Sequence, residues 1–317
     1  MQQNSTLAPA SVKVSEVHKL MGNRFELTVI APDESVGAEW IAAGVEEISR
    51  IERMLTTFSD TSETYAVNEQ AGIAPVKVSS EFLHLVKRAA NISVLTQGAF
   101  DLSYGSIDKR FWNFDQQMTT LPDPAEARKK VALINYRNVV VDEINHTVFL
   151  KERGMRIGFG GIGKGYAAEM AKLVLIEKGA KGGVVNASGD LTTWGNQADG
   201  SPWTIGIANP NAAEQVFSSL DISNNSVATS GNYEKFVVIG GKKYSHTIDP
   251  KTGMPVTGIK SVTIICPNAE MADAMATPVT IMGISAGLYL VNQLKGMACI
   301  IVDDNNKIHT SKNIHII

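Results

Sequence analysis

The chain has 317 residues, 44% hydrophobic and 19% charged, which is typical of an ordinary globular protein that can bury a sizeable core. Its formal net charge of -3 provides no basic field for general binding to nucleic acid or to anionic membranes. The two cysteines, Cys266 and Cys299, lie far apart and lack metal-ligand spacing, so neither a disulfide framework nor a zinc site is indicated.

The N-terminal segment, residues 1–20, is polar and rich in small residues, and we expect it to be a poorly ordered lead-in to a single domain over 21–317. It lacks the basic and apolar regions of a secretory signal. Either the protein is cytoplasmic, or a signal has been removed and replaced by a start Met. Nothing approaches 18 apolar residues in a row, so no transmembrane helix is expected.

The first half of the chain predicts a strand and two helices. The sequence RFELTVIA alternates as a strand does, and VGAEWIAAGVEEISRIERMLTTF has apolar residues at helical spacing up to about Phe58. In SSEFLHLVKRAANISVLTQG, Ser80 is the expected N-cap and Gly98 the expected stop of the second helix.

The second half alternates less regularly. PAEARKKVAL predicts a short helix, NVVVDEINHTVFLKERG predicts two strands, and YAAEMAKLVLIEKGA predicts a helix. Strands punctuated by Gly, Asn and Pro follow, and then the helix ADAMATPVTIMGISAGLYLVNQL and two terminal strands. This mixed order favours an α+β architecture over a doubly wound sheet.

The stretch RIGFGGIGKGYAAE fits two phosphate-binding patterns. Gly158, Gly160 and Gly163 match the dinucleotide fingerprint G-x-G-x-x-G, while Gly158, Gly163 and Lys164 match the opening of a P-loop. A P-loop, however, needs Ser or Thr after the lysine, and this chain has Gly165 there.

The dinucleotide reading is also weak, because the preceding strand is short and the acid Glu177 falls inside the following helix. Both patterns nevertheless share one physical feature, which is a site where the backbone can bind an anion, and this feature is present here. Glycines let an anionic ligand approach the backbone, the next helix points its N-terminal amides there, and Lys164 adds a cation. The alternative is a glycine-rich turn needed only for tight packing.

Two further segments carry side chains suited to chemistry. In YSHTIDPKTGMPV, His246 precedes a strong turn and can act as a general base, although such a histidine can equally be structural. In AEMADAMATPVT, Asp273 and Thr277 stand one helical turn apart and offer hard oxygen ligands to Mg²⁺. Alternatively, Asp273 only caps or charges its helix N-terminus.

The segments GAFDLSYG and NASGDLTTWG each set a carboxylate, Asp101 and Asp190, among small residues. Such stretches are either tight turns or walls of a pocket in which a flat ligand lies against the backbone.

Taken in order, MGNRFE, TTFSDTSETYAVN, GAFDLSYG, GFGGIGKGYAAE, NASGDLTTWG, ATSGNYEKF, SHTIDPKTGMPV and ADAMAT resemble the successive motifs of the ApbE family, the FAD:protein FMN transferases. The resemblance runs from about Met21 to the helix after Thr277. It implies an α+β fold of two intimately associated α/β subdomains, with mainly antiparallel sheets and an FAD cleft between them.

The resemblance implies an Mg²⁺-dependent transfer of FMN from FAD to a threonine hydroxyl of an acceptor flavoprotein, with release of AMP. Some members of the family instead hydrolyse FAD to FMN and AMP. The implied partners are FAD and the acceptor, with no nucleic acid. Most relatives work in the periplasm or cell envelope, so the resemblance also raises peripheral membrane association through a lipoprotein anchor.

The site residues that the resemblance implies fall into three groups. His246 would be the base that takes the proton from the acceptor hydroxyl. The metal would lie between the carbonyl of Gly161 and the side chains of Asp273 and Thr277. The residues implied to bind the FAD are Met21, Phe58, Ala99, Phe100, Asp101, Lys164, Asp190 and Thr247.

Three positions depart from the pattern of the family. Gly158 stands where many members have an aspartate, so a carboxylate that often contacts the FAD is absent. Phe58 replaces a commoner tyrosine but keeps an aromatic face for stacking. Pro278 follows Thr277 within the helix, where it removes a backbone donor and is expected to kink the helix.

Three other functions remain open from the sequence. An FAD pyrophosphatase would use the same site with water as the acceptor. A non-catalytic flavin-binding protein would make Gly158 a sign of decay, and a nicotinamide oxidoreductase would bind NAD(H).

Overall fold

The computed structural model of the protein describes residues 11–108, 111–112, 118–209, 212–231 and 236–314. Its largest element is an antiparallel sheet. Its eight strands lie in the order β1-β2-β6-β7-β10-β13-β14-β15, and each pair of neighbours is antiparallel. They are β1 (Val12–Leu20), β2 (Asn23–Ala31), β6 (Gly183–Ala187), β7 (Asp190–Trp194), β10 (Ser226–Gly231), β13 (Ile259–Cys266), β14 (Ala298–Asp303) and β15 (Ile308–Thr310).

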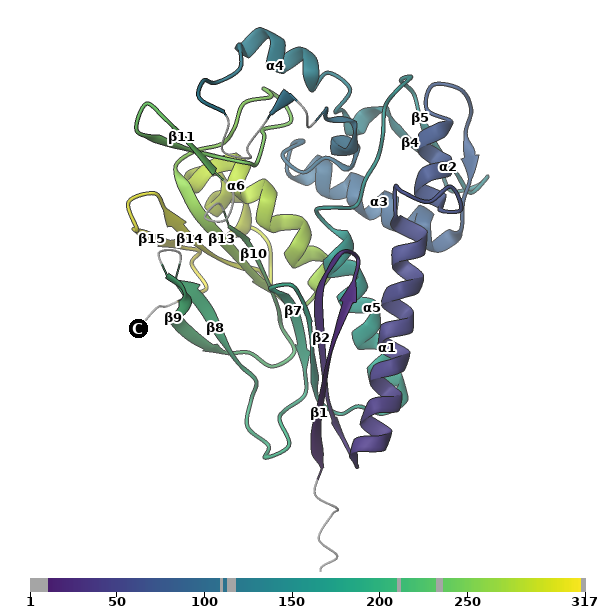
Figure 1. The fold of residues 1–317 in the computed structure, drawn as a ribbon, viewed down its shortest axis with the longest axis vertical. Coiled ribbons are helices and arrows are strands. Elements are labelled where there is room, and N and C mark those ends of the chain that lie inside the picture. The colour runs from purple at the N-terminus through teal and green to yellow at the C-terminus, as the bar shows by residue number, and fades with distance from the viewer. Residues whose placement is uncertain (1–10, 109–110, 113–117, 210–211, 232–235, 315–317) are drawn as a thin grey trace, which may run out of the picture.

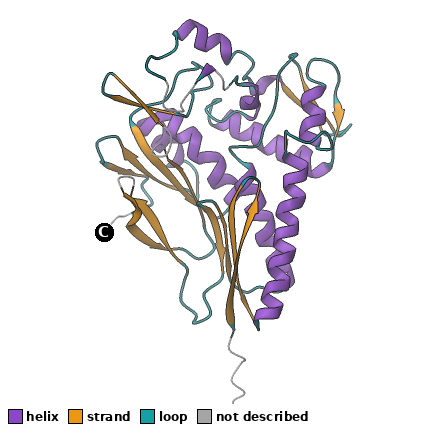
Figure 2. Ribbon diagram, in the orientation of Figure 1, coloured by secondary structure: helices purple, strands orange, loops and turns teal. Residues whose placement is uncertain are grey.

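Three long helices cover one face of this sheet (Figures 1 and 2). They are α1 (Glu34–Leu55), α5 (Gly163–Lys178) and α6 (Ala269–Val291). Strand alternation sets the two faces: Val185 lies in the main core, whereas its neighbour Val184 packs with Leu191 and Ile222 in a separate small cluster. The central strands therefore bury apolar side chains on both faces of the sheet, and the main core lies between the sheet and the helices.

The other elements lie outside the large sheet and its three covering helices. The helices α2 (Glu63–Glu69) and α3 (Ser80–Leu95) pack at one end of α1, and α4 (Pro124–Lys130) lies at the upper edge of Figure 1. Two 3-10 helices are η1 (Leu102–Ser106) and η3 (Tyr136–Asn138). The small sheets contain β3 (Val76–Lys77), β5 (Thr147–Leu150) and β4 (Val139–Asp142); β8 (Thr204–Asn209) and β9 (Ala212–Asp221); and β11 (Phe236–Ile239) and β12 (Lys242–Ser245).

The expected lead-in over residues 1–20 is wrong for its second half, because Val12–Leu20 forms β1 at the edge of the large sheet. The apolar residues of β1 do not alternate regularly with polar ones. The side of β1 that is partly covered carries Glu16 and His18, which form a 2.9 Å hydrogen bond, while Val17 on the other side is 54% exposed. Residues 1–10 lie outside the described part of the chain.

Helix α6 is long and apolar enough to cross a membrane by length and composition alone. In this structure it packs against β13, β10 and α5 as a core helix. The expected kink at Pro278 is not where the helix breaks: the non-helical backbone is at Gly283, where φ is 82° and ψ is 172°. The segment that carries Asp273 and Thr277 therefore precedes the break by at least one turn.

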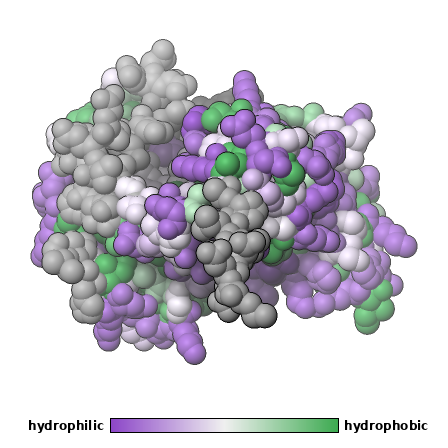
Figure 3. All heavy atoms as spheres, turned by 90° about the horizontal axis from the view of Figure 1, so that it is seen from below, coloured by the Kyte–Doolittle hydropathy of each residue, from purple (hydrophilic) through white to green (hydrophobic). Residues whose placement is uncertain are grey.

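A second, smaller core lies apart from the main one and is formed by Ile107, Trp112, Ala127, Val131, Ile134 and Ile248. It joins the segment after η1 to α4 and to the turn after β12. The 3-10 helix η1 connects the two cores, since Leu102 belongs to the main core while Tyr104 packs against the smaller one. The face of the molecule in Figure 3 is mostly hydrophilic, with hydrophobic residues in small separate groups.

Candidate active site

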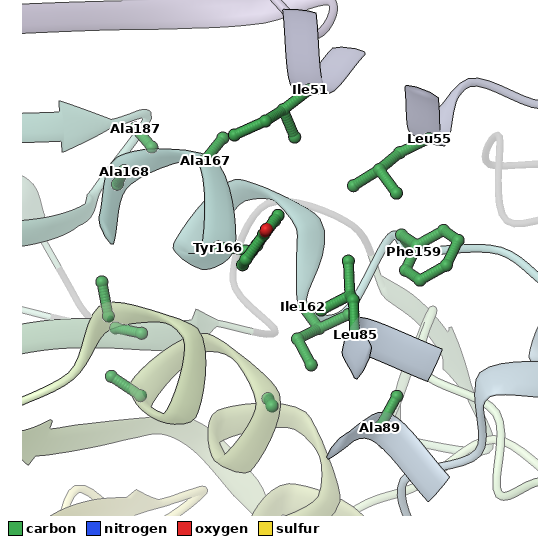
Figure 4. Packing of buried hydrophobic residues seen from close by; sticks show 14 of the residues in the cluster. Ile51, Leu55, Leu85, Ala89, Phe159, Ile162, Tyr166, Ala167, Ala168 and Ala187 are labelled. Atoms are coloured by element: carbon green, nitrogen blue, oxygen red, sulfur yellow. The ribbon is translucent and has the colours of Figure 1, made fainter. Parts of the chain in front are cut away.

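The glycine-rich stretch leads directly into α5, and apolar packing holds the start of α5 in place. Figure 4 shows Ile162 and Tyr166 among labelled side chains of α1 and α3, such as Leu55 and Leu85. Ile162 is the N-cap residue and provides no side-chain hydrogen bond to the helix. Because the first amides of a helix need acceptors, the start of α5 depends on groups from elsewhere.

One such acceptor is Asp273 of α6. Its Oδ2 accepts a hydrogen bond of 2.9 Å from the backbone N–H of Gly165. A Cβ at Gly165 would lie 2.6 Å from the Cβ of Asp273 and would also overlap the carbonyl of Ala269. Position 165 therefore carries glycine because α5 and the first turn of α6 approach closely there, and a Ser or Thr of a P-loop would not fit.

Lys164 lies between two carboxylates. Its ammonium forms an ion pair with Asp190 at the start of β7 and lies 3.8 Å from Oδ1 of Asp273. Burial lowers the pKa of Lys164, but the nearby Asp273 and Asp190 outweigh this effect, so its pKa lies above its ordinary value. Asp190 also accepts a 3.2 Å hydrogen bond from the N–H of Thr229 in β10. The structure thus brings together one cation and two anions from three elements.

Burial raises the pKa of Asp273 to about 6; Asp190 adds to the rise, and Lys164 opposes it. A buried carboxylate with a raised pKa and a specific charge partner is typical of a functional site. Thr277 is half-buried one turn further along α6, on the same face as Asp273. Carboxylate, hydroxyl and carbonyl oxygens form a hard donor set that suits Mg²⁺.

Among the described residues, no group of three or more His, Cys, Asp or Glu side chains could hold a metal ion. The expected ligands Gly161 and Thr277 are not of these types, so that finding does not test them.

Met21 lies beside the start of α5. The turn Met21-Gly22 joins β1 to β2 with both φ angles positive, at 50° and 72°, and the N–H of Met21 donates to Glu52 of α1 at 2.8 Å. Its Cε lies 3.6 Å from the position that a Cβ of Gly163 would take. A strained non-glycine residue is thus held next to the glycine-rich stretch.

The segment from Ala99 to Asp101 is largely buried. A ring carbon of Phe100 lies 3.6 Å from the position that a Cβ of Gly161 would take, so these two expected site residues are neighbours. Asp101 serves the fold through its side chain: it accepts hydrogen bonds from the N–H and hydroxyl of Ser103 and from the N–H of Tyr136. Burial raises the pKa of Asp101, and these hydrogen bonds oppose the rise.

Phe58 and Gly158 are placed differently from the buried cluster. Phe58 follows α1 and is 97% exposed, so its ring is free of packing within the described chain. Gly158 donates a 3.1 Å backbone hydrogen bond to Leu102, and a Cβ there would meet only the Cα of Gly105, at 3.8 Å. Steric packing therefore does not explain a glycine at position 158.

His246 and Thr247 lie at the end of β12 in a turn that packs on the smaller core. His246 is exposed and Thr247 is buried. Backbone hydrogen bonds of 3.0 Å tie Val256 to both sides of His246, through the carbonyl of Thr247 and the N–H of Ser245. The structure therefore fixes the backbone of a histidine that is exposed as a whole residue. Residues 232–235 of the neighbouring motif ATSGNYEKF lie outside the described part of the chain.

Buried polar residues that the sequence pattern did not single out also hold the site. Asn68 forms two hydrogen bonds with the backbone of Ile157, at 2.7 and 3.0 Å, and so fixes the approach to the glycine-rich stretch. Glu169 of α5 accepts a 2.8 Å hydrogen bond from the N–H of Ala269 in α6. A carboxylate within the alanine-rich sequence YAAEMA was the available signal for Glu169.

The comparisons with known proteins agree with this architecture. The model of the ApbE family matches residues 21–301. A FAD:protein FMN transferase of Klebsiella pneumoniae is 31% identical over 291 residues, which cover 91% of this chain and 89% of the relative. Another, from Salmonella typhimurium, is 28% identical over 308 residues, covering 95% of this chain and 86% of the relative.

Solved structures show the same fold. The ApbE protein of Thermotoga maritima matches with a TM-score of 0.84 at 28% identity, over 95% of this chain and 97% of that one. The flavinyl transferase ApbE of Pseudomonas stutzeri matches with a TM-score of 0.83 at 23% identity, over 95% of each chain. The α+β fold with mainly antiparallel sheets is thus confirmed, and the protein is an enzyme of the transferase class.

The chain belongs to the ApbE family.

Proposed function

We propose that this protein transfers the FMN part of FAD to a threonine hydroxyl of an acceptor flavoprotein, in an Mg²⁺-dependent reaction that releases AMP. Family membership supports flavin transfer in general. The observation that carries the proposal is the buried ion cluster of Lys164, Asp190 and Asp273 at the start of α5. A lysine at a helix N-terminus, lined by glycines, suits the pyrophosphate of a dinucleotide.

The chemistry proposed for the chain's own residues follows from their charges. The threonine oxygen attacks the phosphorus on the FMN side of the pyrophosphate, and the bond between that phosphorus and the bridging oxygen breaks. AMP leaves with that oxygen, and His246 takes the proton of the hydroxyl. Lys164 neutralises negative charge on the phosphate oxygens in the transition state.

Mg²⁺ would be held by Asp273, Thr277 and the carbonyl of Gly161, and would supply further neutralisation of charge on the phosphates. Met21, Phe58, Phe100 and the backbone around Ala99 and Thr247 would bind the FAD. The side chain of Asp101 would act by holding its own segment, because its oxygens already accept hydrogen bonds from Ser103 and Tyr136.

The exposure of His246 favours a second candidate, hydrolysis of FAD to FMN and AMP, because water can reach an exposed base. Three incubations with FAD and Mg²⁺ separate the two reactions. The first contains no acceptor, the second contains an acceptor domain with its target threonine, and the third contains the same domain with valine in place of that threonine. The transferase predicts covalent FMN on the threonine acceptor alone, with one AMP for each FMN attached. Rapid AMP release without any acceptor would instead identify a pyrophosphatase.

A further inference from the structure

Helices α5 and α6 each carry a carboxylate that accepts a hydrogen bond from a backbone amide in the first turn of the other helix. Asp273 of α6 accepts a hydrogen bond from the N–H of Gly165 in α5 at 2.9 Å, and Glu169 of α5 accepts one from the N–H of Ala269 in α6 at 2.8 Å. Gly165 and Glu169 stand one turn apart on α5, as do Ala269 and Asp273 on α6. We call these four residues the reciprocal cap.

The reciprocal cap provides hydrogen-bond acceptors for first-turn backbone amides of both helices. Ile162 offers no side-chain acceptor to α5, so Asp273 takes the place of an N-cap residue. At α6, Asn268 caps the N–H of Met271, and Glu169 accepts from Ala269, which is another of the free first-turn amides. A negative charge near a helix N-terminus is also favoured by the helix dipole.

Glu169 is itself held in place. It is 7% exposed, and its Oε1 forms a 2.6 Å ion pair with Lys172, which is 8% exposed and lies one turn further along α5. This pair directs Oε1 to Lys172 and leaves Oε2 for Ala269. The ion pair with Lys172 therefore restrains the position of the Glu169 carboxylate on α5.

We infer that Glu169 is a positioning residue, which holds the first turn of α6 against α5 and thereby sets where Asp273 stands relative to Lys164. The close approach of the helices at Gly165 makes this setting sensitive, because a small slide of α6 would break the hydrogen bond between Gly165 and Asp273. The inference rests on the proposed function for its consequence, which is that Glu169 controls affinity for the divalent cation.

Three variants separate positioning from general stability. Glu169→Ala removes the acceptor of the Ala269 amide. The double variant Glu169→Gln/Lys172→Met keeps an oxygen acceptor and leaves no unpaired buried charge. Ser311→Ala is the matched control, because it removes another buried side-chain acceptor, that of the Cys299 amide at 2.9 Å, far along the sheet at β14.

Two measurements are made on each variant of the full chain. Binding of Mn²⁺ alone is followed by electron paramagnetic resonance, and amide hydrogen exchange is followed at Gly165 and at Ala269. For Glu169→Ala we expect the dissociation constant of Mn²⁺ to rise about tenfold and exchange at both amides to speed up about tenfold. The double variant should restore most of both values, and Ser311→Ala should change neither.

The outcomes distinguish the inference from the proposed function. If exchange at Gly165 is unchanged in Glu169→Ala, the reciprocal cap is not a clamp and the inference is overturned. If exchange accelerates while Mn²⁺ affinity stays that of the wild type, the control over the metal is overturned. If the wild type binds no Mn²⁺ and exchange still accelerates, the clamp is supported and the metal part of the proposed function fails.

Discussion

The junction of α5 and α6 and the turn that carries His246 are built in opposite ways. At the junction, buried Asp273 accepts a hydrogen bond from the backbone amide of Gly165, and partly buried Lys164 pairs with Asp190 and lies near Asp273. At the turn, the backbone is fixed by hydrogen bonds to Val256, but His246 is exposed. Under the proposed function, the largely buried region would bind phosphate and metal, and the exposed region would let a macromolecular acceptor bring its hydroxyl.

Removing the base should produce the largest effect. His246→Ala is expected to slow FMN transfer by about 10²–10⁴-fold, the usual contribution of a general base. Rates of covalent flavin formation test this, with His84→Ala on the exposed face of α3 as the control. An unchanged rate of FMN transfer in His246→Ala would show that His246 is not the general base.

Filling the junction should produce the next largest effect. Gly165→Ala places a Cβ 2.6 Å from that of Asp273, and overpacking of this kind costs about 1–3 kcal/mol of unfolding free energy. Gly160→Ala is the matched control, since nothing lies within 4 Å of a Cβ there. Urea denaturation compares the two. Equal stability of both variants would show that the junction is not tightly packed.

The raised pKa of Asp273 predicts a dependence of stability on pH. Its carboxyl goes from an ordinary 3.8 to about 6 on folding, so between these values the folded chain binds more protons than the unfolded chain. Stability of the metal-free protein is therefore lost as pH rises through this window. Asp273→Asn lacks this loss and can still accept from Gly165.

The variant should accordingly be more stable than the wild type by about 3 kcal/mol at pH 7, and most of the gap should close as the pH falls to about 4. Unfolding free energies measured in a chelating buffer across that range provide the test. A gap that is independent of pH would mean that Asp273 does not titrate in this window. The same substitution should weaken binding of Mg²⁺.

The smallest effect is expected outside both regions, at Phe58. Phe58→Ala should raise the KM for FAD by a factor of about three to ten, as loss of an aromatic stacking contact does. Its unfolding free energy should stay within about 0.5 kcal/mol, since the ring is 97% exposed. Ile144→Ala, at a side chain 92% exposed, is the control. An unchanged KM would show that Phe58 does not contact the flavin.

Sequence patterns predicted the regular elements well where apolar periodicity was strong, as in α1 and β2. They failed at β1, where Glu16 and His18 occupy the partly covered side and hide the alternation. The helix α2 is too short for periodicity to reveal. The failure at β1 arises because a local pattern does not report which side chains tertiary contacts cover, whereas the failure at α2 arises from its length alone.

The candidate site divides in the same way. Spacing alone placed Asp273 and Thr277 on one helical face, and the structure agrees. No spacing could bring Asp190 to Lys164, because their ion pair depends on the order of strands in the sheet. Glu169 was missed because its partner, Ala269, is a hundred residues away in the sequence and contributes only a backbone amide.

The most direct test of the central claim is a crystal structure of the protein with FAD and Mg²⁺ bound. We expect a metal ion about 2.1 Å from oxygens of Asp273 and Thr277, the ammonium of Lys164 on the pyrophosphate, and His246 facing the phosphorus on the FMN side. An FAD whose pyrophosphate lies away from the start of α5, or a metal that does not touch Asp273, would contradict it.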